Sequence, residues 1–231
     1  GELVARKERR LGGIILESQP LKEISDEERI NILTEAVRNS NLELLSWTES
    51  AIHLQERILN LRKWRPEEGW PDLNRDHMLA TIESWLPPWL ATVKKKDDFR
   101  KISLEQIFLA MVDWKLQDKI DKLAPEKILV PSGSWIKVKY QADGSQPVLA
   151  VRLQEIFGMK ETPLINEGRT KLLIHLLSPA FRAVQVTQDL ASFWKNTYPE
   201  VRKELRTRYP KHHWPDDPYT AEAVRGARRK R

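Results

Sequence analysis

Apolar residues in the first half of the chain recur at the three- and four-residue intervals typical of amphipathic helices. Ser25 and Glu28 have the spacing of a capping box ahead of such a stretch, which predicts a helix over 26–38. Similar patterns predict helices over 48–62, from 78 to 85 with an end at Pro87 and Pro88, over 104–112 and over 113–123. The region 25–126 is therefore expected to be a helical bundle-like domain.

The hydrophobic period changes after Pro125. Trp135, Lys137 and Lys139 alternate with apolar neighbours, which predicts a half-buried strand with one apolar and one cationic face. Further strands are expected over 148–151, 171–177 and 182–187, and a helical turn over 152–157. Helices are then expected over 189–197 and 199–208, the second with a proline in its first turn.

These patterns predict an α+β fold, in which the helical domain is followed over 127–218 by a small β-rich, barrel-like domain with C-terminal helices. Residues 1–24 contain a strand-like stretch around Gly12 and Gly13. Because the chain begins with glycine rather than methionine, we expect it to be a fragment and 1–24 to continue a domain upstream.

The positive charge of the chain is concentrated at its C-terminal end. The whole chain has 39 Lys and Arg against 33 Asp and Glu, a net charge of +6. From Lys195 onward there are eleven Lys and Arg against five Asp and Glu, so the first 194 residues are balanced. Such an imbalance favours a polyanionic partner, because clustered cations release counterions from phosphates. The alternative is a solvated surface, and 219–231 is expected to be a flexible basic tail.

Aromatic and basic residues interleave in two places, which makes both candidate nucleic-acid contacts. One is the strand of Trp135, Lys137 and Lys139, whose side chains should share a face. The other follows the last predicted helix and comprises Arg206, Arg208, Tyr209, Lys211, His212, His213 and Trp214. For the strand, the alternative is an exposed face covered by lysine stems.

The nine tryptophans divide by position in the predicted elements. Core packing is the expected role of those in or beside helices, namely Trp47, Trp85, Trp114 and Trp194. The remainder lie near loops or strand starts, where any could be a stacking platform for a base: Trp64, Trp70, Trp89, Trp135 and Trp214.

Several kinds of chemistry find no support in the sequence. There is no cysteine, and none of the nine glycines has the spacing of a phosphate-binding loop. The adjacent His212 and His213 lack further metal ligands at suitable spacing, so neither metal nor cofactor is expected in this chain. No apolar run is long enough for a transmembrane helix, and no signal peptide precedes the first element, so a cytoplasmic location without membrane contact is expected.

Long stretches of the chain resemble a known family. They include LLSPAFRAVQVTQDLASFW, YPEVRKELRTRYPKHHWPDDP, VPSGSWIKVKY and VLAVRLQEIFG, and more loosely LESQPL and WTESA. Together they are similar to the C-terminal region of the HrpB family of bacterial, DEAH-box type ATP-dependent RNA helicases. Ala183 and Thr207 depart from the residues usual there, proline and glycine.

The resemblance implies an accessory region that assists RNA binding by two upstream RecA-like motor domains of the same chain, with single-stranded RNA as partner. ATP and Mg²⁺ would belong to those domains, and the parent would be an NTP hydrolase while this fragment would be inactive alone. Two alternatives remain open. The region could dock another protein through Tyr198, Tyr209 and Trp214, or the segment 209–218 could serve only to hold the last helix, with Trp214 buried.

Overall fold

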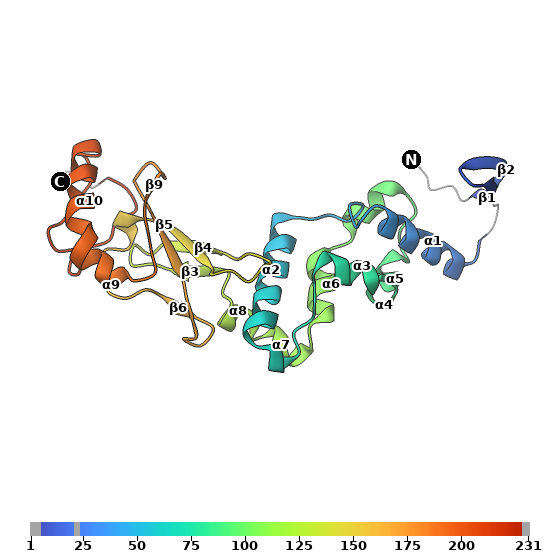
Figure 1. The fold of residues 1–231 in the computed structure, drawn as a ribbon, viewed down its shortest axis with the longest axis horizontal. Coiled ribbons are helices and arrows are strands. Elements are labelled where there is room, and N and C mark those ends of the chain that lie inside the picture. The colour runs from blue at the N-terminus through green and yellow to red at the C-terminus, as the bar shows by residue number, and fades with distance from the viewer. Residues whose placement is uncertain (1–5, 21–23, 228–231) are drawn as a thin grey trace. The chain divides into compact units, whose positions relative to one another are not determined.

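The computed structural model describes residues 6–20 and 24–227 (Figure 1). The chain forms two compact units, one from residues up to 55 together with 71–114, the other from 56–70 together with 115–231. Residues 56–70 and 115–126, assigned to the helical domain from the sequence, therefore belong to the unit that holds the main sheet. The α+β class is confirmed.

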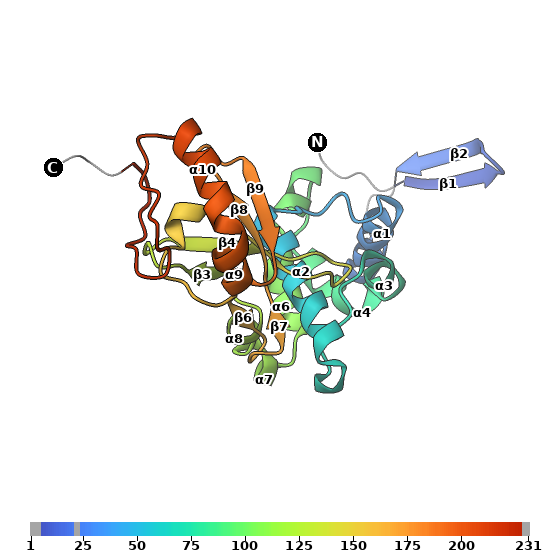
Figure 2. The same cartoon turned by 60° about the vertical axis from the view of Figure 1, so that its left-hand side comes forward.

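The first unit begins with a two-stranded antiparallel hairpin, β1 (Arg6–Leu11) and β2 (Ile14–Pro20), drawn as two paired arrows in Figure 2. Its turn lies at the expected glycine pair, where Gly12 has a φ of 57° that favours glycine. Apolar side chains of the hairpin are exposed, Leu11 to 70 %. Residues 1–5 and 21–23 of the expected segment 1–24 lie outside the described residues.

Helix α1 (Asp26–Asn39) confirms the capping-box prediction, because the Ser25 hydroxyl accepts from the Glu28 amide and the Glu28 carboxylate accepts from the Ser25 amide. Helix α2 (Glu49–Trp64) begins as expected after Thr48, whose hydroxyl accepts from the Ala51 amide. The 3₁₀ turn η1 (Pro66–Glu68) follows it.

The next helices are shorter than predicted. The single helix expected before the proline pair is two, α3 (Arg75–Ala80) and α4 (Ile82–Trp85), and Thr81 between them has a φ of −112° that is not helical. Helix α4 ends at Trp85, ahead of the proline pair as expected. Pro87 also begins a further helix, α5 (Pro87–Leu90), since a first-turn proline needs no amide donor.

The 3₁₀ turn η2 (Lys96–Lys101) leads to α6 (Leu104–Met111), the helix expected over 104–112, where the Ser103 hydroxyl accepts from the Gln106 amide. The helix expected over 113–123 is broken into α7 (Trp114–Gln117) and α8 (Ile120–Leu123). Buried Met78, Ile82, Leu104 and Phe108 belong to the core of the first unit.

The second unit is built on a five-stranded sheet in the order β3-β4-β5-β8-β9. Its strands are β3 (Lys127–Leu129), β4 (Trp135–Lys139), β5 (Val148–Arg152), β8 (Leu173–Leu177) and β9 (Ala183–Thr187). Pairing is antiparallel except between β5 and β8. Among the described strands, β3 and β9 are the two edges of the sheet and do not pair with each other. Barrel-like closure is therefore not confirmed.

Between β5 and β8 the chain forms the expected helical turn as η3 (Leu153–Glu155), then the short hairpin of β6 (Leu164–Ile165) and β7 (Thr170–Lys171). Arg65, after α2, is only 4 % exposed and reaches this hairpin. It donates to Asn166 Oδ1 and Glu167 Oε2 at 2.6 Å each, and to Glu68 Oε1 at 2.7 Å. These partners compensate its buried charge and tie the end of α2 to the sheet unit.

The C-terminal helices are α9 (Leu190–Ser192), the π-helical turn η4 (Phe193–Thr197) and α10 (Tyr198–Arg208). Phe157, Phe193, Trp194 and Tyr198 form an aromatic cluster with ring centroids 5.0–6.3 Å apart, which packs these elements together.

The described part of the expected flexible tail, 219–227, is instead held by hydrogen bonds, whereas 228–231 lie outside the described residues. The Val224 amide donates to the Gln154 carbonyl at 3.0 Å, and Arg225 donates to the carbonyls of Ser132 and Gly133. Gly133 turns the chain between β3 and β4 with a φ of 76°. Within the described ranges, no helix has the length and apolar character needed to cross a membrane.

Candidate nucleic-acid interface

After α10 the chain folds back on the helix and buries Trp214, one of the tryptophans considered as a stacking platform. The Tyr209 amide still bonds to the Leu205 carbonyl at 2.7 Å, and the Trp214 indole N–H donates to the Tyr209 carbonyl at 3.0 Å. Trp214 is only 6 % exposed. Its ring therefore offers no free face to a base in this conformation, as the structural alternative for 209–218 requires.

Two side chains of α10 hold the returning segment. Arg202 Nε donates to the Trp214 carbonyl at 2.9 Å, and its Nη2 pairs with Asp216 at 2.6 Å. The Tyr198 hydroxyl donates to the Pro215 carbonyl at 2.9 Å, and burial raises the pKa of that hydroxyl. The hydroxyl therefore stays protonated and remains a donor.

The predicted cations of this segment remain at the surface. Arg206, Arg208 and Lys211 are all exposed. Arg208 lies 3.2 Å from Glu204, but both side chains are more than half exposed, and such a pair contributes only about 0–1 kcal/mol. The three cations can therefore turn to a polyanion without breaking the packing around Trp214.

The imidazoles are less available than the cations. His212 and His213 are half-buried, and the His212 ring lies edge-on to Tyr209 at 6.1 Å between centroids. Burial, aided by the charge of Arg152, lowers the pKa of His212, so it is neutral at pH 7. The Tyr209 hydroxyl is 3.2 Å from Ser178 Oγ, which connects the segment to the end of β8.

Sequence reasoning missed an exposed ring near this group. Phe181, in the turn between β8 and β9, is 67 % exposed and has a φ of 60°. The guanidinium of Arg152 lies 4.9 Å from its ring centroid and also pairs with Glu155 at 2.9 Å. A phenylalanine directly after Ser-Pro-Ala, in a turn, was the available signal.

The β4 candidates form a second group, and here the aromatic side chain is at the surface. Trp135 is 65 % exposed and Lys139 is exposed. The strand β3, not predicted from the sequence, pairs Leu129 with Trp135 and Lys127 with Lys137. Opposite residues of paired strands share a face, so one face carries an apolar pair beside a pair of lysines.

The lysines of this face are not all equally available. Burial raises the pKa of Glu56 on α2, and the charge of Lys137 opposes that effect, which places the two charges near each other. Lys127 lies 3.3 Å from Glu126, with both side chains about half exposed. Lys139 is the exposed predicted cation of the strand.

Burial also sorts the other tryptophans. Trp70 is 1 % exposed, and Trp64 contacts Tyr140 with ring centroids 6.3 Å apart, so neither resembles an open platform. Trp114 was expected in the core but is 74 % exposed, because α7 is a single turn that leaves it at the surface. Trp89 is half-buried.

Comparison with known proteins supplies the family. The family model described as ATP-dependent helicase C-terminal matches residues 85–218, more than half of the chain. The chain belongs to the HrpB-type ATP-dependent helicase C-terminal family. The ATP-dependent RNA helicase HrpB of Escherichia coli strain K12 is 39 % identical over 218 residues, which cover 94 % of this chain and 27 % of that protein.

Two crystal structures of E. coli HrpB agree with this assignment. One, described as a DExH-box NTPase, matches 97 % of this chain with a TM-score of 0.84 and 37 % identity. The other, described as a DEAH/RHA helicase, matches 92 % with a TM-score of 0.73 and 35 % identity. This chain spans 29 % and 28 % of their lengths, so it corresponds to between a quarter and a third of an HrpB protein.

Proposed function

We propose that this chain is an accessory region that helps an HrpB-type helicase to bind and guide single-stranded RNA. In this proposal the upstream RecA-like domains hold ATP and Mg²⁺ and perform the hydrolysis, and the protein acts in the cytoplasm. The chain alone should release no phosphate from ATP, since it lacks a phosphate-binding loop.

The observation that carries the proposal is the face formed by β3 and β4. Trp135 exposes a ring there, and Lys127, Lys137 and Lys139 are near it on the same two strands. A flat ring stacks on any base, while neighbouring cations follow the phosphates. Exposed Arg206, Arg208 and Lys211 extend the positive charge of the same unit.

The arrangement favours an unpaired strand over a duplex. Stacking on Trp135 needs a base whose flat face is accessible, and in a duplex those faces are covered by neighbouring bases. Three lysines and three further cations supply a contact to backbone phosphates that does not depend on sequence. The expected binding is therefore tolerant of sequence and sensitive to salt.

A protein-docking role is the second candidate, and one observation favours it. Leu129 is 53 % exposed directly opposite Trp135, and this apolar pair adds contact area that a nucleic-acid strand does not need. The anchors first considered for docking are less suitable, since Tyr198 and Trp214 are buried.

The deciding experiment measures binding of a fluorescent single-stranded RNA to the chain and to Trp135→Ala. Loss of a stacked base should weaken binding by about 1–3 kcal/mol and leave the salt slope nearly unchanged. Trp114→Ala is the matched control, because it removes another exposed tryptophan from a different element. Equal effects of both substitutions, or no RNA binding at low salt, would contradict the proposal.

A further inference from the structure

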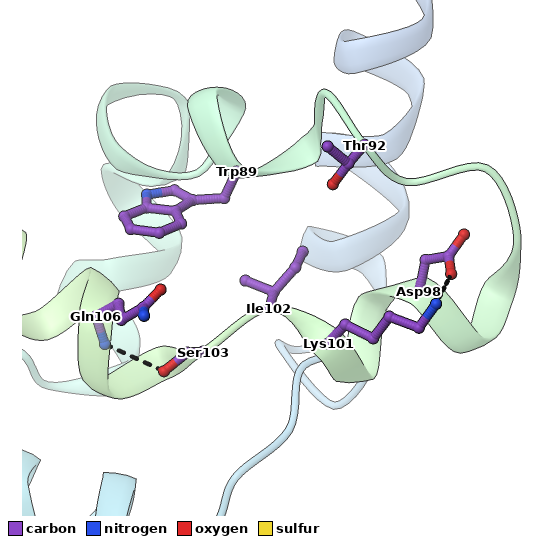
Figure 3. A pocket seen from close by; sticks show the side chains of 7 residues that line it. All are labelled: Trp89, Thr92, Asp98, Lys101, Ile102, Ser103 and Gln106. Carbon is purple, nitrogen blue, oxygen red and sulfur yellow. Dashed lines mark hydrogen bonds and ion pairs between the residues drawn. The ribbon is translucent and has the colours of Figure 1, made fainter.

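The first unit contains a hollow of about 250 Å³ between α5, η2 and α6 (Figure 3). Seven residues line it: Trp89, Thr92, Asp98, Lys101, Ile102, Ser103 and Gln106. Figure 3 shows Trp89 and Gln106 toward one end of the hollow and the pair of Asp98 and Lys101 toward the other. An aromatic end and a cationic end are thus part of one concave surface.

At the aromatic end, Trp89 directly follows Pro88 in α5 and is half-buried. In the described part of the chain its ring contacts no other aromatic ring and no cation, unlike Trp47, which packs against Phe108 and Arg75. The side-chain amide of Gln106 at this end, and the hydroxyl of Thr92 farther along the hollow, have no hydrogen-bond partner among the described residues. A ligand ring could therefore meet both a flat surface and unused donors and acceptors.

At the cationic end, Asp98 holds the loop that carries Lys101. Its carboxylate accepts from the amides of Lys94 and Lys95 at 3.0 Å and from Lys101 Nζ at 2.8 Å. The bond from Lys101 and these amide contacts lower the pKa of Asp98 to about 2. The carboxylate therefore serves to position the loop and Lys101.

The loop itself is strongly positive. Residues 94–101 contain five Lys and Arg against two Asp. The lysines and the arginine are all exposed. A ligand that reaches from Trp89 toward Lys101 would thus pass into a positive field, which favours an anionic group at that end.

The size of the hollow limits the ligand. Pockets for drug-sized molecules and cofactors usually measure about 300–1,000 Å³, so this one suits a single ring system with its attached group. A flat ring with hydrogen-bonding edges, joined to an anion, is the chemistry that matches both ends.

We propose that this hollow binds one nucleotide of a single-stranded RNA, with the base on Trp89, the base edge at Gln106 and the phosphate at Lys101. The proposal rests on the proposed function and adds a contact in the first unit. It makes Trp89 a base-stacking residue and Lys101 a phosphate-binding residue. An acidic peptide is the competing ligand, and the test separates the two.

The first measurement is affinity, by fluorescence anisotropy with an oligouridylate of about 12 nucleotides. Trp89→Ala should raise Kd about 5- to 150-fold, whereas Trp89→Phe keeps a flat ring and most of the affinity. Lys101→Gln should lower the salt slope of log K by about 0.7, since one phosphate contact is lost. Lys122→Gln, an exposed lysine on α8, controls for the change in net charge.

The second measurement uses the unaltered chain, so it does not depend on how well a variant folds. Oligouridylate that carries 4-thiouridine is photo-crosslinked, and the tryptic peptide 76–94 is analysed by fragmentation. A crosslink at Trp89 or Thr92, together with the expected affinity changes, supports the proposal.

Three outcomes would overturn it. Crosslinks confined to 127–139 or 206–214, with unchanged affinity of Trp89→Ala, would remove the hollow from RNA binding but leave the proposed function intact. Absence of RNA binding at low salt would overturn both. Polyglutamate binding that Trp89→Ala weakens, without any RNA crosslink in 76–94, would assign the hollow to an acidic protein partner.

Discussion

The two cationic groups of the sheet-bearing unit place their tryptophans in opposite environments. After α10, Trp214 is 6 % exposed and its indole N–H is bonded to a carbonyl, while Arg206 and Lys211 are at the surface. On β4, Trp135 is 65 % exposed, and its neighbour Lys137 is partly covered and close to Glu56. Similar mixtures of aromatic and basic residues thus give a buried tryptophan in one group and an exposed tryptophan in the other.

The difference follows from the local backbone. A strand sends alternate side chains to one face, so Trp135 and Lys137 must lie on the same face of the sheet. A chain that reverses after a helix can direct each side chain separately, and hydrophobic burial then selects the large indole of Trp214 for the inside. Interleaved rings and cations therefore indicate a stacking surface more reliably in a strand than in a turn.

The largest expected effect is on stability. Trp214→Ala should lower the free energy of unfolding by about 3–5 kcal/mol, because a large buried side chain is lost. Trp135→Ala, at an exposed position, should change it by about 0.5 kcal/mol or less. Urea unfolding followed by circular dichroism measures both. Equal losses for the two variants would end the contrast drawn between them.

The next effect concerns electrostatics at the end of α10. Replacing Arg206, Arg208 and Lys211 together by glutamine should lower the salt slope of log K for single-stranded RNA by about 2, at about 0.7 per phosphate contact. Stability should hardly change, since all three are exposed. The control replaces three other exposed lysines of the unit, Lys160, Lys171 and Lys195. Unchanged RNA binding together with a lower melting temperature would favour the structural role of 209–218.

A smaller effect is expected from removing one buried tyrosine hydroxyl near each of the two cationic groups. Tyr198→Phe removes the donor to the Pro215 carbonyl and should cost about 0.5–1.5 kcal/mol of stability. It should also speed tryptic cleavage after Lys211. Tyr140→Phe removes a similar bond, to the Pro125 carbonyl beside β4, and should leave that cleavage rate unchanged. The same acceleration in both variants would argue against a local role for Tyr198.

The smallest effect depends on pH. Burial and the nearby Arg152 lower the pKa of His212, so between that pKa and about 6.5 the unfolded chain binds more protons than the folded chain. The contribution of neutral His212 to stability is then full above about pH 6.5 and is lost as the pH falls through the folded pKa. His212→Gln should lack this decline. Melting temperatures of both proteins from pH 7.5 to 5.5 test it, and parallel curves would contradict it.

Local signals were enough for much of the fold. The capping box at Ser25 and the alternation that begins at Trp135 are complete within a few residues, and each predicted its element correctly. The start of α10 beside Pro199 was found for the same reason. The exposed Trp135 also followed from its strand pattern, since its face could be read directly from the period.

Features that depend on distant partners were not predicted. The three-residue strand β3 exists because Lys127 and Leu129 find partners on β4, and the parallel pairing of β5 with β8 joins residues such as Val148 and Leu173. Burial of Trp214, which the sequence left as one of two open alternatives, involves Arg202, twelve residues earlier. The hollow at Trp89 needs the loop 94–101 folded by Asp98. None of these contacts is visible in the spacing of residues alone.

The bonds of Arg57 and Arg65 affect when the protein can fold during its synthesis on the ribosome. Arg57 is 6 % exposed and donates to the Ala124 carbonyl, and Arg65 bonds to Glu167, which is 102 residues later in the chain. At about 5–20 residues per second, the ribosome needs about 5–20 s to supply that partner. During this interval the second half of α2 has emerged with its charges still hydrated. The sheet-bearing unit is therefore expected to complete its folding only after Glu167 has emerged from the ribosome.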